Sequence, residues 1–340
     1  MKHKTFFWFV LPSALTMLLF IFFPMVSIVV QSLHVSHEQV IIEVENCGPF
    51  GCRQSTTVDQ EATEALRSAK PLGQFAGLTT YTDRGHLAVN EVGTAWNASQ
   101  TWRDFGASML NLPFYNAMAF TLTYTFVVTP LVIILGFMIA VAVNSAIKAI
   151  RGPLIFFSLL PMIITPLVGA LILFWMVDAR GIVGTLLINI SGDPGFSIKA
   201  STPLMWIMLI VYGVWHSAPF AFIVYYAGLQ TVNSETLESA MIDGATRWQR
   251  IQYVVLPHLL PLTTFIALMQ FMDNFRVFEP IVSFSAEAHA TSLSWAIFND
   301  LGGETQQLSS AAATSVLTVI GIIILLTPVL IRTWRDFGQK

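Results

Sequence analysis

The sequence predicts an all-α membrane protein with six transmembrane helices, and three observations support this prediction. Of the 340 residues, 54% are hydrophobic and only 11% are charged, whereas about a quarter of the residues of a soluble domain are charged. Phe and Trp occur 26 and 9 times, which suits helices that face lipid. Six apolar stretches reach the length of about 20 residues that a bilayer core requires. They are 6–31, 114–144, 153–177, 203–231, 258–284 and 309–332.

The first stretch follows Lys2 and Lys4, an arrangement that signal peptides share. Its apolar run of about 25 residues exceeds the run of about 7–15 residues in a signal peptide. We therefore expect residues 1–31 to remain in the protein as its first transmembrane helix. Prolines within the later stretches do not argue against helices, because membrane helices accept them when neighbouring groups bond the freed carbonyl.

Lysine and arginine residues indicate the orientation, because they concentrate in cytoplasmic loops. The opposite short loops contain only Arg180 and Lys199. The remaining positive charges near the spans lie at the two ends and in two alternate loops: Lys2, Lys4, Lys148, Arg151, Arg247, Arg250, Arg332, Arg335 and Lys340. Both termini are therefore predicted to be cytoplasmic.

Residues 32–113 form a polar insertion between the first span and the five-helix core at 114–340. The predicted topology places this insertion outside the cytoplasm, as a small domain or a long ordered loop. It contains the only two cysteines, Cys47 and Cys52, in the run Cys-Gly-Pro-Phe-Gly-Cys. Pro and Gly favour a turn, and an oxidising compartment favours a structural disulfide between these residues. A redox-active pair is disfavoured because such pairs have two intervening residues, whereas four intervene here.

Residues 235–257 lie between the fourth and fifth spans, on the predicted cytoplasmic side. Helix-forming residues are followed by Asp243 and Gly244, which break the pattern, and then by an amphipathic run that ends at Leu256-Pro257. This order predicts a helix, a turn and a second helix. Composition alone also fits an ordinary amphipathic helix at the membrane surface.

The order of residues in this segment resembles the EAA loop of binding-protein-dependent ABC importer permeases. That loop has Glu-Ala-Ala, three further residues and Gly, with Leu-Pro downstream. The matching residues are Glu238, Ala240, Asp243, Gly244, Ala245, Leu256 and Pro257. Ser239 replaces the middle alanine, and Ile251 replaces a common phenylalanine.

The resemblance implies that the segment is a cytoplasmic coupling helix that docks in a cleft of an ATPase subunit. Gly244 is expected to set the turn, because glycine adopts a positive φ at little cost. Glu238 and Asp243 are expected to form hydrogen bonds with the backbone or with the partner. Ala240 and Ala245 are expected to keep the surface around the turn low, because their side chains are short.

The same resemblance implies the partners and the cellular location. No Gly-Lys pair occurs in the chain, so the phosphate-binding loop of nucleotide-binding proteins is absent. The chain is therefore expected to be a permease without a catalytic site or cofactor, while ATP and Mg²⁺ belong to the partner ATPase. The expected partners are a second related permease, two ATPase subunits and an extracytoplasmic solute-binding protein, in the cytoplasmic membrane of a bacterium or archaeon.

Other features resemble the carbohydrate-uptake, maltose-type branch of these permeases. They include the enlarged first outer loop, Trp215 and Pro219 before Leu229-Gln230, and a fifth span rich in phenylalanine. The Gly-Gly-Pro common after that span is absent, and residues 285–291 take its place. This departure leaves the identity of the solute open.

Helical spacing and the resemblance together predict a substrate-binding surface near the midplane. Its residues share one face of the fourth or the fifth span: Gly213, Ser217 and Phe220, and Asp273, Asn274 and Val277. Ionisable residues inside a span are functional by default, but Asp273 and Arg276 are also spaced to pair with each other. An arginine near the cavity, Arg276, is also compatible with an acidic or sulfonated sugar as the solute. His216 is expected to form a hydrogen bond between helices.

Other classes of function fit the sequence less well. A net charge of −3 gives no basic surface for nucleic acid. A secondary transporter would show inverted repeats, which the sequence lacks. A metal-dependent or nucleophilic enzyme is disfavoured because His37-Glu38 lacks the second histidine and Ser108 lacks the glycine that follows a nucleophile. A permease of the same class for amino acids, phosphate or another solute remains as the alternative.

Overall fold

The computed structural model describes residues 2–35, 40–48, 51–70, 72–193, 195–302 and 306–338. These residues fall into two compact units, which are described separately. Unit 1 contains Met1–Asn116 and Ala296–Ile320, and unit 2 contains Ala117–Trp295 and Gly321–Lys340.

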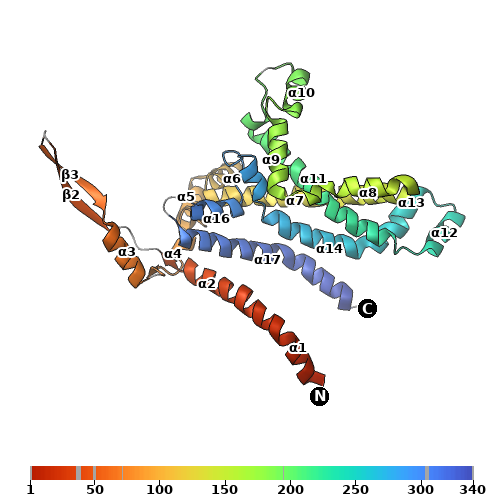
Figure 1. Cartoon of the computed structure of the whole chain (residues 1–340), viewed down its shortest axis with the longest axis horizontal. Helices are drawn as coiled ribbons and strands as arrows, with labels where there is room; N and C mark the ends of the chain where they lie inside the picture. The colour runs from red at the N-terminus through yellow and green to blue at the C-terminus, as the bar shows by residue number, and fades with distance from the viewer. Residues whose placement is uncertain are drawn as a thin grey trace. The chain divides into compact units, whose positions relative to one another are not determined.

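Unit 1 begins with a long apolar helix. α1 (Lys2–Met17), the π-helical turn η1 (Leu18–Phe22) and α2 (Phe23–Ser32) follow one another without a break, in red in Figure 1. Most large apolar side chains between Phe6 and Val30 are exposed. Such a surface requires lipid or another subunit around it.

The insertion after the first helix contains two short antiparallel strand pairs. The strand β1 (His34–Val35) pairs with β4 (Gln74–Phe75), and β2 (Ile41–Gly48) forms a hairpin with β3 (Gly51–Val58). These strands are absent from the all-α prediction, which is otherwise confirmed by the helical spans. In the hairpin Cys47 lies opposite Cys52. Their side chains lie outside the described part of the structure, so the disulfide stays a prediction.

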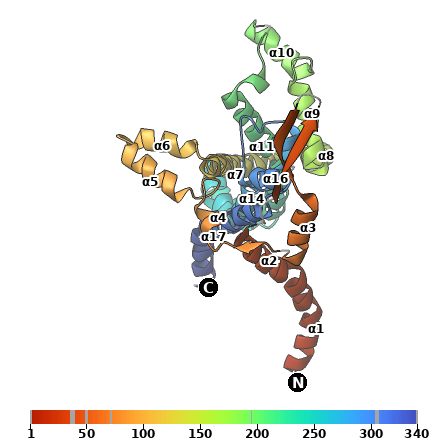
Figure 2. The same ribbon diagram turned by 90° about the vertical axis from the view of Figure 1, so that its left-hand side faces the viewer.

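Four helices complete the insertion: α3 (Gln60–Ala69), α4 (Thr79–Thr82), α5 (Val89–Ala98) and α6 (Trp102–Leu110). Figure 2 shows α5 and α6 side by side. Trp96 of α5 meets the rings of Trp102 and Phe105 edge to face, with centroid distances of 5.4 and 5.3 Å. These aromatic contacts join the two helices.

Unit 2 is built around four long helices. They are α7 (Pro113–Ser145, from Ala117 onward), α8 (Lys148–Ile163), α11 (Thr202–Leu229) and α14 (Leu256–Phe275). They run along one another in Figure 1, and Figure 2 views α7, α11 and α14 nearly end-on. Helix α11 contacts both α8 and α14.

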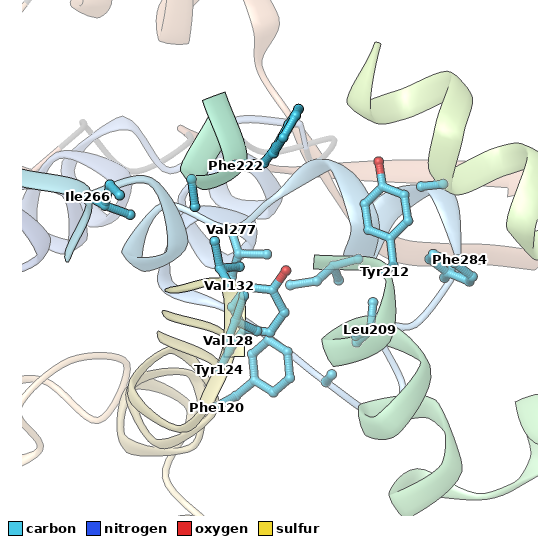
Figure 3. Packing of buried hydrophobic residues seen from close by; sticks show 14 of the residues in the cluster. Phe120, Tyr124, Val128, Val132, Leu209, Tyr212, Phe222, Ile266, Val277 and Phe284 are labelled. Atoms are coloured by element: carbon cyan, nitrogen blue, oxygen red, sulfur yellow. The ribbon is translucent and has the colours of Figure 1, made fainter. Parts of the chain in front are cut away.

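The core of unit 2 lies between α7 and α11. Phe120 and Tyr124 project from α7 toward the helix that carries Leu209 and Tyr212 (Figure 3). The helices approach closely because Gly136 of α7 faces α11: a Cβ at this position would lie 2.5 Å from the Cβ of Ala221. Small residues permit such close approach of membrane helices.

The predicted continuous third span at 153–177 is wrong. Helix α8 ends at Ile163, and a new helix, α9, runs from Pro166 to Val177 and rises away from α8 in Figure 1. Thr165 is extended, with φ −59° and ψ 143°, because a following proline disfavours the helical conformation. Helix α10 (Ile182–Ser191) and the 3₁₀ turn η2 (Ile198–Ala200) lead to α11.

The fifth span is reached through a surface segment and ends earlier than predicted. Helices α12 (Ser234–Ile242) and α13 (Arg247–Arg250) and the π-helical turn η3 (Ile251–Val255) precede α14, which stops at Phe275. The chain continues as α15 (Glu279–Ser283), α16 (Leu293–Gly302) and α17 (Leu308–Gly338).

Six helices of the described residues are long and apolar enough to cross a membrane. They are Phe6–Ser32, Pro113–Ser145, Pro166–Ser191, Thr202–Leu229, Arg247–Phe275 and Leu308–Ile331. The predicted number of spans is therefore confirmed. The third differs in position, because α9 and α10 together form the long apolar segment there.

Candidate functional site: the coupling turn and the polar groups of the spans

The segment that resembles the EAA loop folds as a helix, a tight turn and a second helix. Helix α12 ends at Ile242, and α13 begins at Arg247. Gly244 lies between them with φ +81°, a left-handed conformation that costs other residues about 1–2 kcal/mol. The sequence-based interpretation of Gly244 as the residue that permits the turn agrees with this backbone.

Two backbone hydrogen bonds close the turn. The amide of Gly244 donates to the carbonyl of Met241 at 3.1 Å, and the amide of Ala245 donates to the carbonyl of Ala240 at 2.9 Å. Together they make a complete Schellman motif, with Gly244 at the left-handed position. The motif satisfies carbonyls at the end of α12 that would otherwise lack donors.

The Schellman geometry gives a local reason for two of the matching alanines. Ala240 and Ala245 occupy the two positions, before and after the glycine, whose side chains commonly touch in this motif. Both are half-buried, while Ser239 and Met241 beside Ala240 are exposed. Short side chains at these positions therefore close the turn without adding bulk to its outer surface.

A capping box begins the second helix directly after the turn. The Thr246 hydroxyl accepts from the Gln249 amide at 3.3 Å, and the Gln249 side chain accepts from the Thr246 amide at 2.8 Å. This reciprocal pair fixes the first turn of α13. The segment from Ala240 to Gln249 is thus held in shape by its own backbone and caps.

Large apolar side chains surround this turn and point into solvent. Ile242 is 87% exposed and Trp248 is 70% exposed, and Met241 and Tyr253 are exposed as well. Glu238 and Asp243 are also exposed. We call these six side chains the coupling surface. An apolar surface with charges at its side is typical of a contact with another protein.

The predicted substrate residues of the fourth span, which is α11, have different surroundings. Gly213 is buried, and a Cβ there would overlap the Tyr124 hydroxyl of α7, so this glycine permits helix packing. Ser217 and Phe220 are half-buried, and the Phe220 ring lies 6.3 Å from the ring of Phe265 of α14. Of the three, only Ser217 and Phe220 keep part of their surface exposed, and their role in solute binding stays a prediction.

The three predicted residues of the fifth span do not share one accessible face. Asp273 is exposed and pairs with Arg276 at 3.0 Å. Asn274 and Val277 are only 5% and 6% exposed, and Val277 lies beyond the last residue of α14. The expected common face is wrong because the helix ends at Phe275. The expected pairing of Asp273 with Arg276 is present.

Asn274 is held by neighbouring side chains of the protein. Its amide nitrogen donates to Thr129 Oγ1 of α7 at 3.1 Å and to Gln270 Oε1 at 3.4 Å. All three side chains are buried. This arrangement joins α7 to α14 through a polar contact of the kind that links membrane helices.

The break between α8 and α9 is stabilised by a side chain of α11 that spacing arguments did not identify. The Tyr212 hydroxyl donates to the carbonyl of Pro166 at 2.5 Å. His216 Nε2 has no hydrogen-bond partner among the described residues, so the interhelical hydrogen bond expected of His216 stays a prediction. Pro166 after a polar residue was the only signal of this break in the sequence.

Residues 285–291, which stand in place of the Gly-Gly-Pro of the maltose-type branch, begin within a second Schellman turn. The amide of Ala286 donates to the carbonyl of Ile281 at 2.9 Å, and the amide of Ser285 donates to the carbonyl of Val282 at 3.1 Å. Ser285 takes the left-handed position with φ +48°. A non-glycine residue thus adopts here the conformation that favours glycine.

Residues 105–334 match the family model described as "Binding-protein-dependent transport system inner membrane component". The maltodextrin transport system permease protein MdxF of Bacillus subtilis is 31% identical over 286 residues, which cover 78% of this chain and 64% of that protein. The trehalose/maltose permease protein MalF of Thermococcus litoralis is 26% identical, over 62% of this chain and 71% of that protein.

A solved structure shows the same fold. A bacterial ABC transporter involved in the import of the acidic polysaccharide alginate has a chain with a TM-score of 0.58 and 22% identity. The match covers 73% of this chain and 88% of that chain. At this identity the likeness concerns the fold.

The surroundings of Asn274 and Asp273 predict effects of different size on the free energy of unfolding when each is substituted. Asn274→Leu leaves the Gln270 carbonyl oxygen without its donor and should lower the free energy of unfolding by about 0.5–2 kcal/mol. Asp273→Asn removes an exposed ion pair and should change it by less than about 1 kcal/mol. Unfolding of the purified protein in mixed micelles measures both. Equal stability of the Asn274 variant and the wild type would contradict the structural role.

Proposed function

Because the chain belongs to the family of binding-protein-dependent transport system inner membrane components, we propose that it carries a sugar or sugar derivative across the membrane. Members of this family are permease subunits of ABC importers, and the chain is accordingly a non-catalytic, multi-pass protein of the inner membrane. The solute, the partners and the sites are the parts that we propose.

The coupling surface is the observation that carries the mechanism. Its turn is rigid, since the Schellman motif and the capping box close it from within. Its apolar side chains remain free of the rest of the chain. We infer that an ATPase subunit covers this surface, and that Ala240 and Ala245 allow close contact around Gly244. ATP and Mg²⁺ are bound by that partner.

A rigid turn can transmit movement to the spans because no flexible segment separates it from α14. From Arg247 the chain passes through α13 and η3 into α14 as one helical segment. When the ATPase subunits close on ATP, movement of the turn would tilt α14 and open the solute pathway to the other side. Alternating access then follows from rigid-body motion of helices.

A carbohydrate is supported by the relatives and by the residue types in the spans. The names of MdxF and MalF refer to maltodextrin and to trehalose and maltose. Phe220 is half-buried beside Ser217, and aromatic faces with hydroxyl groups suit sugars. The exposed pair of Asp273 and Arg276 would let Arg276 exchange its partner for the carboxylate of an acidic sugar.

The assembly we propose has a second related permease, two ATPase subunits and an extracytoplasmic binding protein. The exposed apolar surface of the spans fits a partner permease and lipid. The alginate transporter of similar fold is also known in complex with a periplasmic protein that holds an alginate pentasaccharide. Six spans would then supply half of the pathway, and the termini would face the cytoplasm.

Substitution of Gly244 tests the coupling. Gly244→Val forces a branched residue into φ +81°, and about 1–2 kcal/mol of strain corresponds to roughly a tenfold loss of uptake if it acts on docking. ATP hydrolysis by the assembled transporter should continue without matching uptake. Membrane insertion should be unchanged.

A matched control separates docking from strain. Gly192 also has a positive φ, +70°, and open space around it, but it ends α10 and lies outside the coupling surface. Gly192→Val should keep coupled uptake, and Gly244→Asn should restore part of it, since asparagine tolerates this conformation. Normal uptake by Gly244→Val would contradict the proposal.

The solute is tested by binding to the cognate extracytoplasmic protein. The probes for titration calorimetry are maltose, a malto-oligosaccharide, an alginate oligosaccharide, amino acids and phosphate. We expect a saturable heat of binding with at least one saccharide and none with the amino acids or phosphate. Binding of an amino acid or of phosphate would overturn the sugar assignment while leaving the coupling mechanism in place.

A further inference from the structure

Unit 1 contains a polar cavity of about 370 Å³ that the transport mechanism does not use. The segment 80–86 forms one side of this cavity, and the first turn of α17 forms the other. Its lining residues are Val35, Thr80, Asp83, Gly85, His86, Gln307, Ser309 and Ser310. Cavities that bind small ligands have volumes of about 300–1,000 Å³.

Three of the residues that line the cavity carry buried polar atoms that lack partners. His86, Ser309 and Thr80 are only 3%, 6% and 7% exposed. Each has one side-chain atom without a hydrogen-bond partner among the described residues: His86 Nδ1, Ser309 Oγ and Thr80 Oγ1. Burying such a group without a partner costs about 1–3 kcal/mol, so three in one cavity indicate that a polar molecule completes them.

The hydrogen bonds around His86 determine what its free nitrogen requires. His86 Nε2 lies 3.1 Å from the carbonyl oxygen of Ser310. A carbonyl only accepts, so Nε2 carries the proton, and Nδ1 of the neutral ring is an acceptor. The Ser310 hydroxyl does not compete for this role, because it donates to Asp300 Oδ2 at 2.6 Å. The cavity therefore requires a ligand that donates to His86.

The hydroxyls of Thr80 and Ser309 require a ligand that also accepts. Each has one O–H to donate and lone pairs to receive. An ammonium ion donates to His86 but leaves both O–H groups without acceptors, and a neutral amine has only one lone pair for the two of them. A ligand with several hydroxyl groups satisfies all three atoms, because each hydroxyl both donates and accepts.

Charge argues against an ionic ligand. Among the described residues that line the cavity there is no lysine or arginine, and Asp83 is one of them, which disfavours an anion. No group of three His, Cys, Asp or Glu side chains among the described residues is placed to hold a metal ion. A neutral ligand remains.

We propose that this cavity binds a neutral polyhydroxyl compound, either a monosaccharide unit or a polyol. On the predicted topology it opens on the extracytoplasmic side, and none of its described lining residues is among those assigned to translocation. The site is inferred from the cavity alone and does not depend on which solute the pathway carries.

Ligand-dependent thermal unfolding of the full chain, purified in nanodiscs with its associated subunits, tests the proposal. Methyl α-D-glucopyranoside and sorbitol are the probes, and sodium sulfate, ethylammonium chloride and calcium chloride are the comparisons. We expect a saturable rise in Tm with the two polyhydroxyl probes and none with the ions. The assay needs neither ATP nor uptake, so its failure is distinct from failure of the coupling mechanism.

Two variants assign the binding to this cavity. Thr80→Val and Ser309→Ala each remove an unpartnered hydroxyl, so the Tm without ligand should be equal or higher. The apparent Kd for both probes should weaken about tenfold, as loss of a buried hydrogen bond predicts. Thr82→Val is the control, because Thr82 is exposed on the same short helix and its hydroxyl bonds to the Thr79 carbonyl.

Each remaining outcome would overturn the proposal. Absence of a saturable shift in the wild type means that the cavity holds water alone. A shift that both variants retain in full places the binding elsewhere. A shift with an ion and none with the polyhydroxyl probes means that the ligand belongs to another class.

Discussion

Backbone hydrogen bonds that a helix gives up inside a membrane must be remade within the protein, since hydrocarbon offers no partner. The described residues of unit 2 meet this constraint at two breaks. Tyr212 bonds to Pro166 where α8 gives way to α9. Ser292 donates to the carbonyl of Val277 beyond the end of α14 at 2.6 Å, and Thr121 accepts from the amide of Leu293 at 3.2 Å. Tyrosine, serine and threonine side chains thus let the spans change direction while α7, α11 and α14 stay packed.

The coupling turn solves the same problem in a different way. Its carbonyls are satisfied by the backbone of the turn itself, through Gly244 and Ala245, and its next helix is capped by Thr246. No side chain from another span is needed. Ile242 and Trp248 are consequently free to face a partner, which is the arrangement a subunit requires when another protein drives its movement.

Sequence reasoning succeeded where the signal was local. Apolar length gave the number of spans, and the order of residues from Glu238 to Gly244 gave the turn, because Gly244 alone decides the backbone there. It failed where distant contacts decide. α14 ends at Phe275 without a nearby proline or glycine before Pro280, so helical spacing wrongly grouped Asp273 with Val277. The unpartnered polar atoms of His86 and Ser309 could not be foreseen either. Ser309 belongs to α17, which lies more than two hundred residues from His86 in the chain.

The most direct test of the account is to identify what covers the coupling surface. A photo-crosslinking amino acid at Ile242, the most exposed apolar residue of the coupling surface, should join this chain to a nucleotide-binding subunit in native membranes. The same amino acid at Ile190, exposed on α10, should not. Crosslinks from Ile242 to lipid alone, or equal crosslinking of the nucleotide-binding subunit from both positions, would contradict the account.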